Sequence, residues 1–204
     1  MSEPVVLRPR FGLVLCFIVW AIIVVAIGSL IGQGDVLNAV RFIPAFLLAA
    51  FGCWMLFWAP AVQIDATGVR LQNIARAVRI SWPAVASVDT KYTLTIRTVG
   101  GRRFGAWSAP GPSRLTTFRA TRQDLRNLPK TTYGPGNSVG IGDLPSSDSG
   151  LAALRVRQYW EQLRAAGHLD SGAVEGSGVE TTWYRTRLIV LAVLAAATLA
   201  GALL

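Results

Sequence analysis

Three long stretches of the chain contain no charged side chain and frame a polar middle part. They are residues 11–32, 42–62 and 188–204. The first stretch would form a helix about 33 Å long, which matches the hydrocarbon core of a bilayer. The second begins after Arg41, and Pro60 ends its helix. We therefore expect membrane spans at residues 11–32, 42–59 and 188–204.

The first and third stretches each allow a second interpretation. A cleavable signal peptide would have a shorter apolar region, and no clear small-x-small cleavage site follows the first stretch before the next span. The third stretch is Ala-rich and close to the lower length limit for a span, so a hydrophobic tail packed on a partner is the alternative there. Trp183 and Tyr184 precede it at the place of an aromatic belt, which favours a span.

Arginine residues flank the expected spans mainly on one side. In the loop between the first two spans the only basic residue is Arg41, and Asp35 is opposite in sign. The other flanking arginines are Arg8 and Arg10, Arg70, Arg76 and Arg79, and Arg185 and Arg187. Because basic residues mark the cytoplasmic side, we expect a multi-pass protein of the plasma (inner) membrane. Its N-terminus and polar domain are then cytoplasmic, and its C-terminus is outside.

Both cysteines lie in the first two spans. About nine residues join these spans, so the spans form a tight antiparallel hairpin that brings Cys16 and Cys53 to a similar depth. Either the two thiols face each other, or the two cysteines face lipid or are merely small apolar residues. The polar domain has no cysteine, which excludes a disulfide framework there and fits a reducing compartment.

Between the second and third spans the pattern changes to short alternating segments. Tight-turn signals separate these segments, at Thr67-Gly68, Trp82-Pro83 and Gly100-Gly101. The expected strands are residues 63–65, 69–71, 78–80, 91–98 and 102–107. Short antiparallel strands joined by tight turns predict a small barrel or sandwich.

A helix follows a long loop rich in proline and glycine, residues 108–150. Ser147, Asp148 and Ser149 are plausible N-caps, the helix begins near Leu151, and Gly167 ends it. Its apolar face consists of Ala152, Val156, Tyr159, Trp160 and Leu163. Its opposite, polar face consists of Arg157, Glu161 and Arg164. An aromatic stripe of this kind predicts a helix that closes the open end of the barrel.

Two segments resemble the opening of bacterial pleckstrin-homology (PH) domains. They are residues 62–69, Val-Gln-Ile-Asp-Ala-Thr-Gly-Val, and residues 79–85, Arg-Ile-Ser-Trp-Pro-Ala-Val. They are most similar to the membrane-anchored type related to the low-molecular-weight protein antigen family of actinomycetes. The resemblance covers about residues 60–167 and implies a PH-like β-barrel capped by a C-terminal helix. It gives Trp82, Tyr159 and Trp160 structural roles.

These patterns divide the chain into four parts. Residues 1–60 form an N-terminal tail and the transmembrane hairpin, and residues 61–167 form the α+β PH-like domain. Residues 168–187 are a linker, and residues 188–204 are the third span. The first hairpin of the domain offers only Arg70 and Arg76, so phosphoinositide binding does not follow from the resemblance.

Catalytic and metal-binding constellations are missing from the sequence. The only histidine, His168, lies beside the expected helix end, where its charged form suits the helix dipole. Asp65, Asp89 and Asp124 are isolated from one another, and the Gly-rich pairs lack the context of a phosphate-binding loop. We therefore expect no enzymatic activity, no cofactor and no metal.

One basic segment stands out in the polar domain. It consists of Arg114, Arg119, Arg122, Arg126 and Lys130, opposed only by Asp124. It is either a solvated loop or a contact for anionic phospholipid head groups, which attract nearby basic residues. The pI near 10.7 also fits nucleic acid, but no aromatic-interleaved strand face or known motif supports that partner, so we expect none.

Two functions fit these features. The first is a non-enzymatic adaptor or scaffold that binds lipid head groups or a protein partner at the inner membrane face. The second is an accessory subunit of a larger inner-membrane complex, in which the spans make the contacts. Small residues that allow close helix approach are Gly28, Gly32, Ala192, Ala196 and Gly201.

Overall fold

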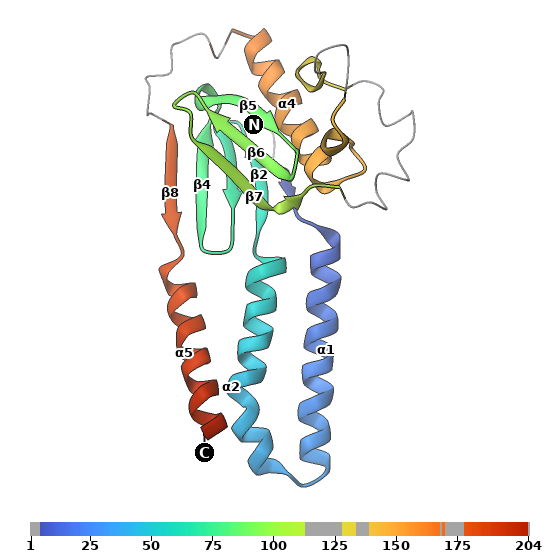
Figure 1. Ribbon diagram of the computed structural model, residues 1–204, viewed down its shortest axis with the longest axis vertical. Coiled ribbons are helices and arrows are strands. Elements are labelled where there is room, and N and C mark those ends of the chain that lie inside the picture. Colours follow the sequence, from blue (N-terminus) through green and yellow to red (C-terminus); the bar gives the residue numbers. More distant parts are fainter. Residues whose placement is uncertain (1–4, 113–127, 134–138, 168, 170–177, 204) are drawn as a thin grey trace. The chain divides into compact units, whose positions relative to one another are not determined.

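The computed structural model describes residues 5–112, 128–133, 139–167, 169 and 178–203 (Figure 1). The contacts divide the chain into two compact units. One unit consists of residues 9–59 and 183–204, and the other of residues 1–8 and 60–182.

The first unit is built from apolar helices. They are α1 (Arg10–Gly32), α2 (Val36–Cys53), the π-helical turn η1 (Trp54–Trp58) and α5 (Arg185–Leu203). Among the described residues, three stretches are long and apolar enough to cross a membrane: Phe11–Gly32, Val36–Trp58 and Arg185–Leu203. The second stretch begins at Val36, six residues before the expected span at residue 42. The helix begins there because the side chain of Asp35 accepts a hydrogen bond from the Asn38 amide and caps α2.

The α1–α2 hairpin brings the two cysteines together. Both side chains are buried, the Cys16 thiol donates to the Cys53 carbonyl at 3.3 Å, and the two Sγ atoms lie 3.4 Å apart. Nearby, the Trp20 indole donates to the Ala50 carbonyl at 3.2 Å. The expectation that the two cysteines lie at a similar level of the hairpin is therefore confirmed, and of the two alternatives the structure favours contact between the thiols.

Helix α2 also contacts α5. The Arg41 guanidinium donates to the carbonyls of Gly201, at 2.7 Å, and Ala202, at 3.4 Å. These carbonyls belong to the last turn of α5, where no helical N–H remains to pair with them. Arg41, in sequence only a loop-side charge, thus caps another helix, and the positive charge suits the negative end of its dipole.

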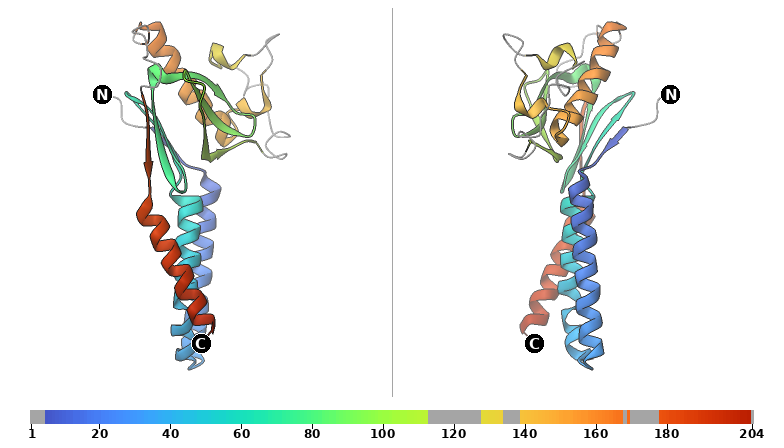
Figure 2. Two further views of the ribbon diagram at one scale, coloured as in Figure 1. Left: turned by 60° about the vertical axis from the view of Figure 1, so that its left-hand side comes forward. Right: turned by 90° about the vertical axis from the view of Figure 1, so that its right-hand side faces the viewer.

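The second unit contains two antiparallel sheets (Figure 2). Sheet A has the order β1-β2-β3-β4-β8, and sheet B has the order β5-β6-β7. The strands of sheet A are β1 (Val5–Leu7), β2 (Ala61–Asp65), β3 (Gly68–Gln72), β4 (Arg76–Ser81) and β8 (Val179–Trp183). Those of sheet B are β5 (Val85–Asp89), β6 (Thr93–Thr98) and β7 (Arg103–Pro110). The five strands expected from alternation are confirmed, whereas β1, β5 and β8 were not expected.

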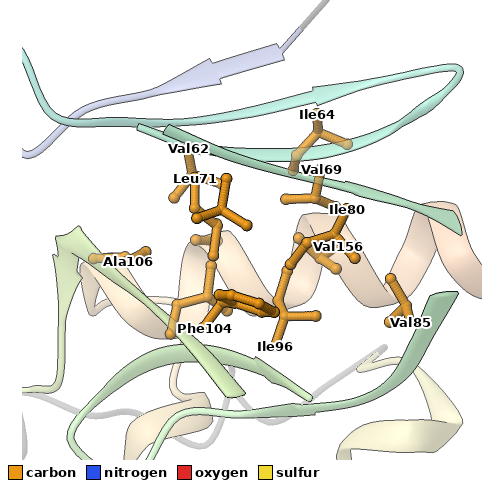
Figure 3. Close-up of a cluster of buried hydrophobic side chains, with 14 of the residues drawn as sticks. Val62, Ile64, Val69, Leu71, Ile80, Val85, Ile96, Phe104, Ala106 and Val156 are labelled. Atoms are coloured by element: carbon orange, nitrogen blue, oxygen red, sulfur yellow. The ribbon is translucent and has the colours of Figure 1, made fainter. Parts of the chain in front are cut away.

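The core lies between the two sheets and helix α4 (Asp148–Ala165). Alternate side chains of β2, β3 and β6 point inward, as the period of two requires. Figure 3 shows Val62, Ile64, Val69, Leu71 and Ile80 of sheet A pointing toward Ile96, Phe104 and Ala106 of sheet B, with Val156 of α4 among them. Ser147 caps α4 by accepting from the Gly150 amide at 3.0 Å, and Gly167 follows the helix with φ +72°. The predicted cap and helix end are confirmed.

The expected barrel is not closed, which corrects the prediction. The 3-10 turn η2 (Trp82–Ala84) separates β4 from β5, so the strands form two sheets. At the β7 edge, the Asn73 carboxamide takes the place of a strand. Its Nδ2 donates to the Gly105 carbonyl at 2.9 Å, and its Oδ1 accepts from the Trp107 amide at 2.8 Å. Sequence alternation predicts strands, but it does not predict which edges pair.

Three strands of sheet A are nearly continuous in the chain with the apolar helices. Only Arg8 and Pro9 separate β1 from α1, and only Ala59 and Pro60 separate η1 from β2. Tyr184 alone separates β8 from α5. The domain is therefore joined to the helices at three points of the chain.

Candidate binding surface

Most of the predicted basic segment lies outside the described residues. Arg114, Arg119, Arg122 and Arg126 belong to residues 113–127, whose placement is not described. Lys130 is exposed in the 3-10 turn η4 (Lys130–Thr132). The structure therefore shows what holds the two ends of this segment.

Both ends of the basic segment are attached to the domain. On the N-terminal side, the Gly111 amide donates to the Tyr92 carbonyl at 2.8 Å. On the C-terminal side, Leu128 is buried, and the Thr131 amide and hydroxyl both donate to Glu161 Oε1 of α4 at 2.8 Å. The loop thus starts and ends at defined points of the fold.

A buried ion pair fixes the part of the long loop (residues 108–150) that follows the basic segment. Arg157 of α4 donates to Asp143 Oδ1 at 2.6 Å and to the Val88 carbonyl at 2.8 Å. Thr90 Oγ1 also donates to Asp143 Oδ1, at 2.7 Å. Asp143 ends the 3-10 turn η6 (Ile141–Asp143), and a Cβ at its neighbour Gly142 would clash with the Thr90 carbonyl. The network therefore joins α4, sheet B and the long loop.

The burial of Arg157 corrects the predicted polar face of α4. Only 5% of its surface is exposed, because the described parts of the loop cover this side of the helix. Ala153, one turn earlier on the same side, is fully buried. The position of Ala153 on the helical wheel is the sequence signal that could have placed Arg157 at the edge of the buried face.

Two arginines oppose each other on the outward face of sheet B. Arg97 of β6 and Arg103 of β7 are register partners, and both are exposed. Like charges directly opposite each other destabilise a sheet, and among the described residues no carboxylate forms an ion pair with either. We call this the arginine face. Trp107, further along β7 on the same face, is 54% exposed. Sequence reasoning missed this surface because it depends on register.

The first hairpin offers less free charge. Arg79, the register partner of Arg70, forms an ion pair with Asp65 at 3.4 Å. Desolvation opposes ionisation of Asp65, but the Thr67 hydroxyl and amide, the Arg79 charge and the Gly68 amide outweigh it, so the pKa of Asp65 is lowered. Asp65 thus neutralises part of this surface, whereas the arginine face has no such partner among the described residues.

Of the three aromatic residues predicted to be structural, Tyr159 and Trp160 belong to α4, and Trp82 packs against this helix. Trp82 is 2% exposed, its indole donates to the Asp65 carbonyl at 3.0 Å, and its ring stacks on Tyr159 with centroids 5.1 Å apart. Trp160 is only partly buried, and the Arg164 guanidinium lies 5.8 Å from its ring centroid. Trp82 is therefore the more deeply packed of the two tryptophans.

The described residues contain no group of three or more His, Cys, Asp or Glu that could hold a metal ion. His168 and Asp124 lie outside them. Asp65 and Asp89 both accept hydrogen bonds from the backbone of nearby turns. These two carboxylates therefore have turn-forming roles, and Asp65 also forms an ion pair with Arg79.

A protein-family model described as Bacterial PH domain matches residues 59–129. The domain is PH-like. The matched residues contain strands β2 to β7, whereas β1, α4, β8 and the apolar helices lie outside the match. No curated protein and no solved structure matches the chain. A bacterial PH domain suggests binding rather than catalysis, since this family is generally non-catalytic.

Proposed function

We propose that this protein is a non-enzymatic adaptor, anchored in the plasma membrane by three spans, whose PH-like domain binds anionic lipid head groups at the cytoplasmic face. The observation that carries the proposal is a PH-like domain set in the chain between apolar helices. We also propose that it is of the actinomycete antigen type that residues 79–85 resemble.

The charge of the domain supports lipid as the ligand. Residues 63–187 contain 17 basic and 9 acidic residues. Basic residues near an anionic leaflet gain about 1 kcal/mol each. The spans would keep the domain at a high effective concentration beside the membrane, so weak contacts suffice. The basic segment and the arginine face are the two groups of cations proposed to make them.

The test uses the full chain in nanodiscs of phosphatidylcholine, with or without phosphatidylglycerol. Hydrogen exchange is measured in the β6–β7 hairpin and in residues 113–127. We expect slower exchange in anionic discs and loss of this difference at high salt, because screening weakens exposed charges. The Arg97→Gln/Arg103→Gln variant should lose the difference in the hairpin, and Arg119→Ala/Arg122→Ala should lose it in the basic segment.

The matched control is Arg155→Gln/Arg164→Gln, which removes the same charge from exposed positions of α4. It should leave the protection unchanged. Equal exchange in neutral and anionic discs would contradict lipid binding by the domain and would favour a protein partner.

A second function, accessory subunit of a larger inner-membrane complex, is favoured by α1. A Cβ at Gly12 would lie 2.8 Å from the Phe57 carbonyl, and one at Gly201 would lie 3.2 Å from the Arg41 carbonyl, so these glycines serve contacts within the unit. Gly28 and Gly32, spaced as in a GxxxG motif, have nothing within 4 Å. A stable complex in mild detergent that Gly28→Leu/Gly32→Leu disrupts, and Gly52→Leu does not, would support this function.

A further inference from the structure

The guanidinium of Arg187 is held between two aromatic rings in the apolar unit. Arg187 belongs to the first turn of α5, and its guanidinium carbon lies 3.9 Å from the Tyr184 ring centroid and 4.9 Å from that of Trp54. Tyr184 immediately precedes α5, and Trp54 begins the π-helical turn at the end of α2. Two elements distant in sequence thus fix one cationic group.

This guanidinium has no oxygen acceptor among the described residues. Its NH1 atom is buried without a hydrogen-bond partner, and no ion pair within the described part of the chain includes Arg187. A guanidinium carries five N–H donors, and ring faces attract its charge without replacing the acceptors that these donors need. Buried polar groups without partners are rare in native proteins and call for an unobserved water or ion.

Among the described residues, the first turn of α5 adds positive charge near Arg187 and no negative charge. Arg185 is exposed in the same turn, and the first turn of α5 contains no acidic residue. Arg41, the other described arginine of α2 and α5, is engaged by the last turn of α5. An anion from outside the described residues is therefore the missing partner at this end of the helix.

The aromatic residues indicate where that anion comes from. Tryptophan and tyrosine gather at the level of the lipid head groups, where one end of the side chain is apolar and the other is wet. Trp54, Trp58, Trp183 and Tyr184 lie at the ends of the two helices that meet here. At this depth a bilayer supplies phosphate oxygens, and the planar fork of arginine binds phosphate through two parallel hydrogen bonds.

We infer that Arg187 and Arg185 bind the phosphate of an anionic phospholipid, with Trp54 and Tyr184 holding the Arg187 guanidinium in place. This site belongs to the helices, not to the PH-like domain, and it rests on the proposed function in one respect only, that the helices span the membrane. Arg187 supplies the oriented fork, and Arg185 adds charge at the rim.

The test is native mass spectrometry of the full chain in mild detergent, titrated with phosphatidylglycerol or phosphatidylcholine. The wild-type protein should retain phosphatidylglycerol in preference to phosphatidylcholine. Arg187→Gln should weaken this retention by about fivefold or more, the equivalent of about 1 kcal/mol per basic residue. Arg187→Lys keeps the charge without the fork and should fall between the two. Trp54→Leu should weaken retention while leaving every charge in place.

Arg155→Gln, which removes an equal charge from the domain, is the control and should retain phosphatidylglycerol as wild type does. Retention by Arg187→Gln equal to wild type, or equal losses in Arg187→Gln and Arg155→Gln, would overturn the site. A carboxylate of a co-purifying protein as the true partner of Arg187 would give the first of these results. Carbonate extraction distinguishes failure of this site from failure of the proposed function. If carbonate removes the chain from the membrane, its helices do not span the membrane and the proposed function fails.

Discussion

Asp143 and Arg157 show how one buried ion pair can organise a long loop. Asp143 accepts from two donors, and Arg157 also reaches the Val88 carbonyl of sheet B. A buried charge is tolerated only while its partners remain, because its lost hydration is replaced by these contacts. The pair therefore makes the position of η6 depend on α4.

Removing one member of this pair should be costly. We expect Asp143→Ala to lower the free energy of unfolding by about 3–5 kcal/mol, because Arg157 is then buried without its partner. The double change Asp143→Leu/Arg157→Met should cost much less. Arg155→Ala, at an exposed position of the same helix, should change stability by about 0.5 kcal/mol or less. Thermal unfolding of the purified chain measures all three, and equal effects of Asp143→Ala and Arg155→Ala would contradict a structural role.

Asp65 predicts a dependence of stability on acid pH. Its pKa is lowered from 3.8 in the folded protein, so its ionised form stabilises the fold above the pKa of the unfolded chain. This stabilisation should be lost as pH falls below about 3.8, through the lower pKa of the folded state. We expect Asp65→Asn to flatten the fall in melting temperature over this range. A slope identical to that of wild type would show that other groups control the acid response.

At the scale of elements, the α1–α2 hairpin is defined by contacts between side chains and backbone. Gly12 allows close approach to Phe57, Trp20 donates to Ala50, and the two thiols touch. In an apolar environment, such packing and interhelical hydrogen bonds hold helices together, since lipid gives no hydrophobic driving force. The register of the hairpin is therefore set at its buried seam.

The cysteine pair tests this register. Mild oxidation of membranes should link Cys16 to Cys53, because the Sγ atoms are already 3.4 Å apart. Cleavage after Arg41 followed by non-reducing electrophoresis detects the link, since the two halves of the hairpin stay joined. The Cys16→Ser/Gly28→Cys variant keeps two thiols at different depths and should give no product. Absence of product from wild type would count against the observed packing of α1 on α2.

At the scale of the whole molecule, the chain enters and leaves the domain through strands of one sheet. Strands β1, β2 and β8 of sheet A each lead into or out of an apolar helix across one or two residues. Residues 5–7, which sequence reasoning treated as part of a tail, thus add a third connection. Under the proposed topology, all three connections lie on the cytoplasmic side.

A reporter fusion tests this topology. Alkaline phosphatase fused after Leu204 should be active, and the same enzyme inserted near Gly136 should be silent, because the topology proposed from the arginine bias puts the domain in the cytoplasm. An insertion at Gly34, between the first two helices, is the control and should be active. Activity near Gly136 with silence after Leu204 would reverse the orientation and remove the basis for lipid binding at the inner face.

Features that depend on local periodicity could be predicted from sequence alone. The three apolar helices follow from uninterrupted runs, and the alternation in β6 and the aromatic stripe of α4 follow from periods of two and 3.6. The cap at Ser147 and the helix end at Gly167 follow from side-chain chemistry that acts within a few residues. Each of these depends on residues close together in the chain.

Only the tertiary structure decided the features that join distant residues. The open arrangement of the sheets depends on Asn73 meeting β7, the arginine face depends on the register of Arg97 with Arg103, and the burial of Arg157 depends on Asp143. The contact of the Arg187 guanidinium with the Trp54 ring likewise joins two residues that lie more than a hundred positions apart in the chain. Periodicity fixes which way a side chain points along its own element, but the partner it meets is set by packing between elements, which no local pattern records.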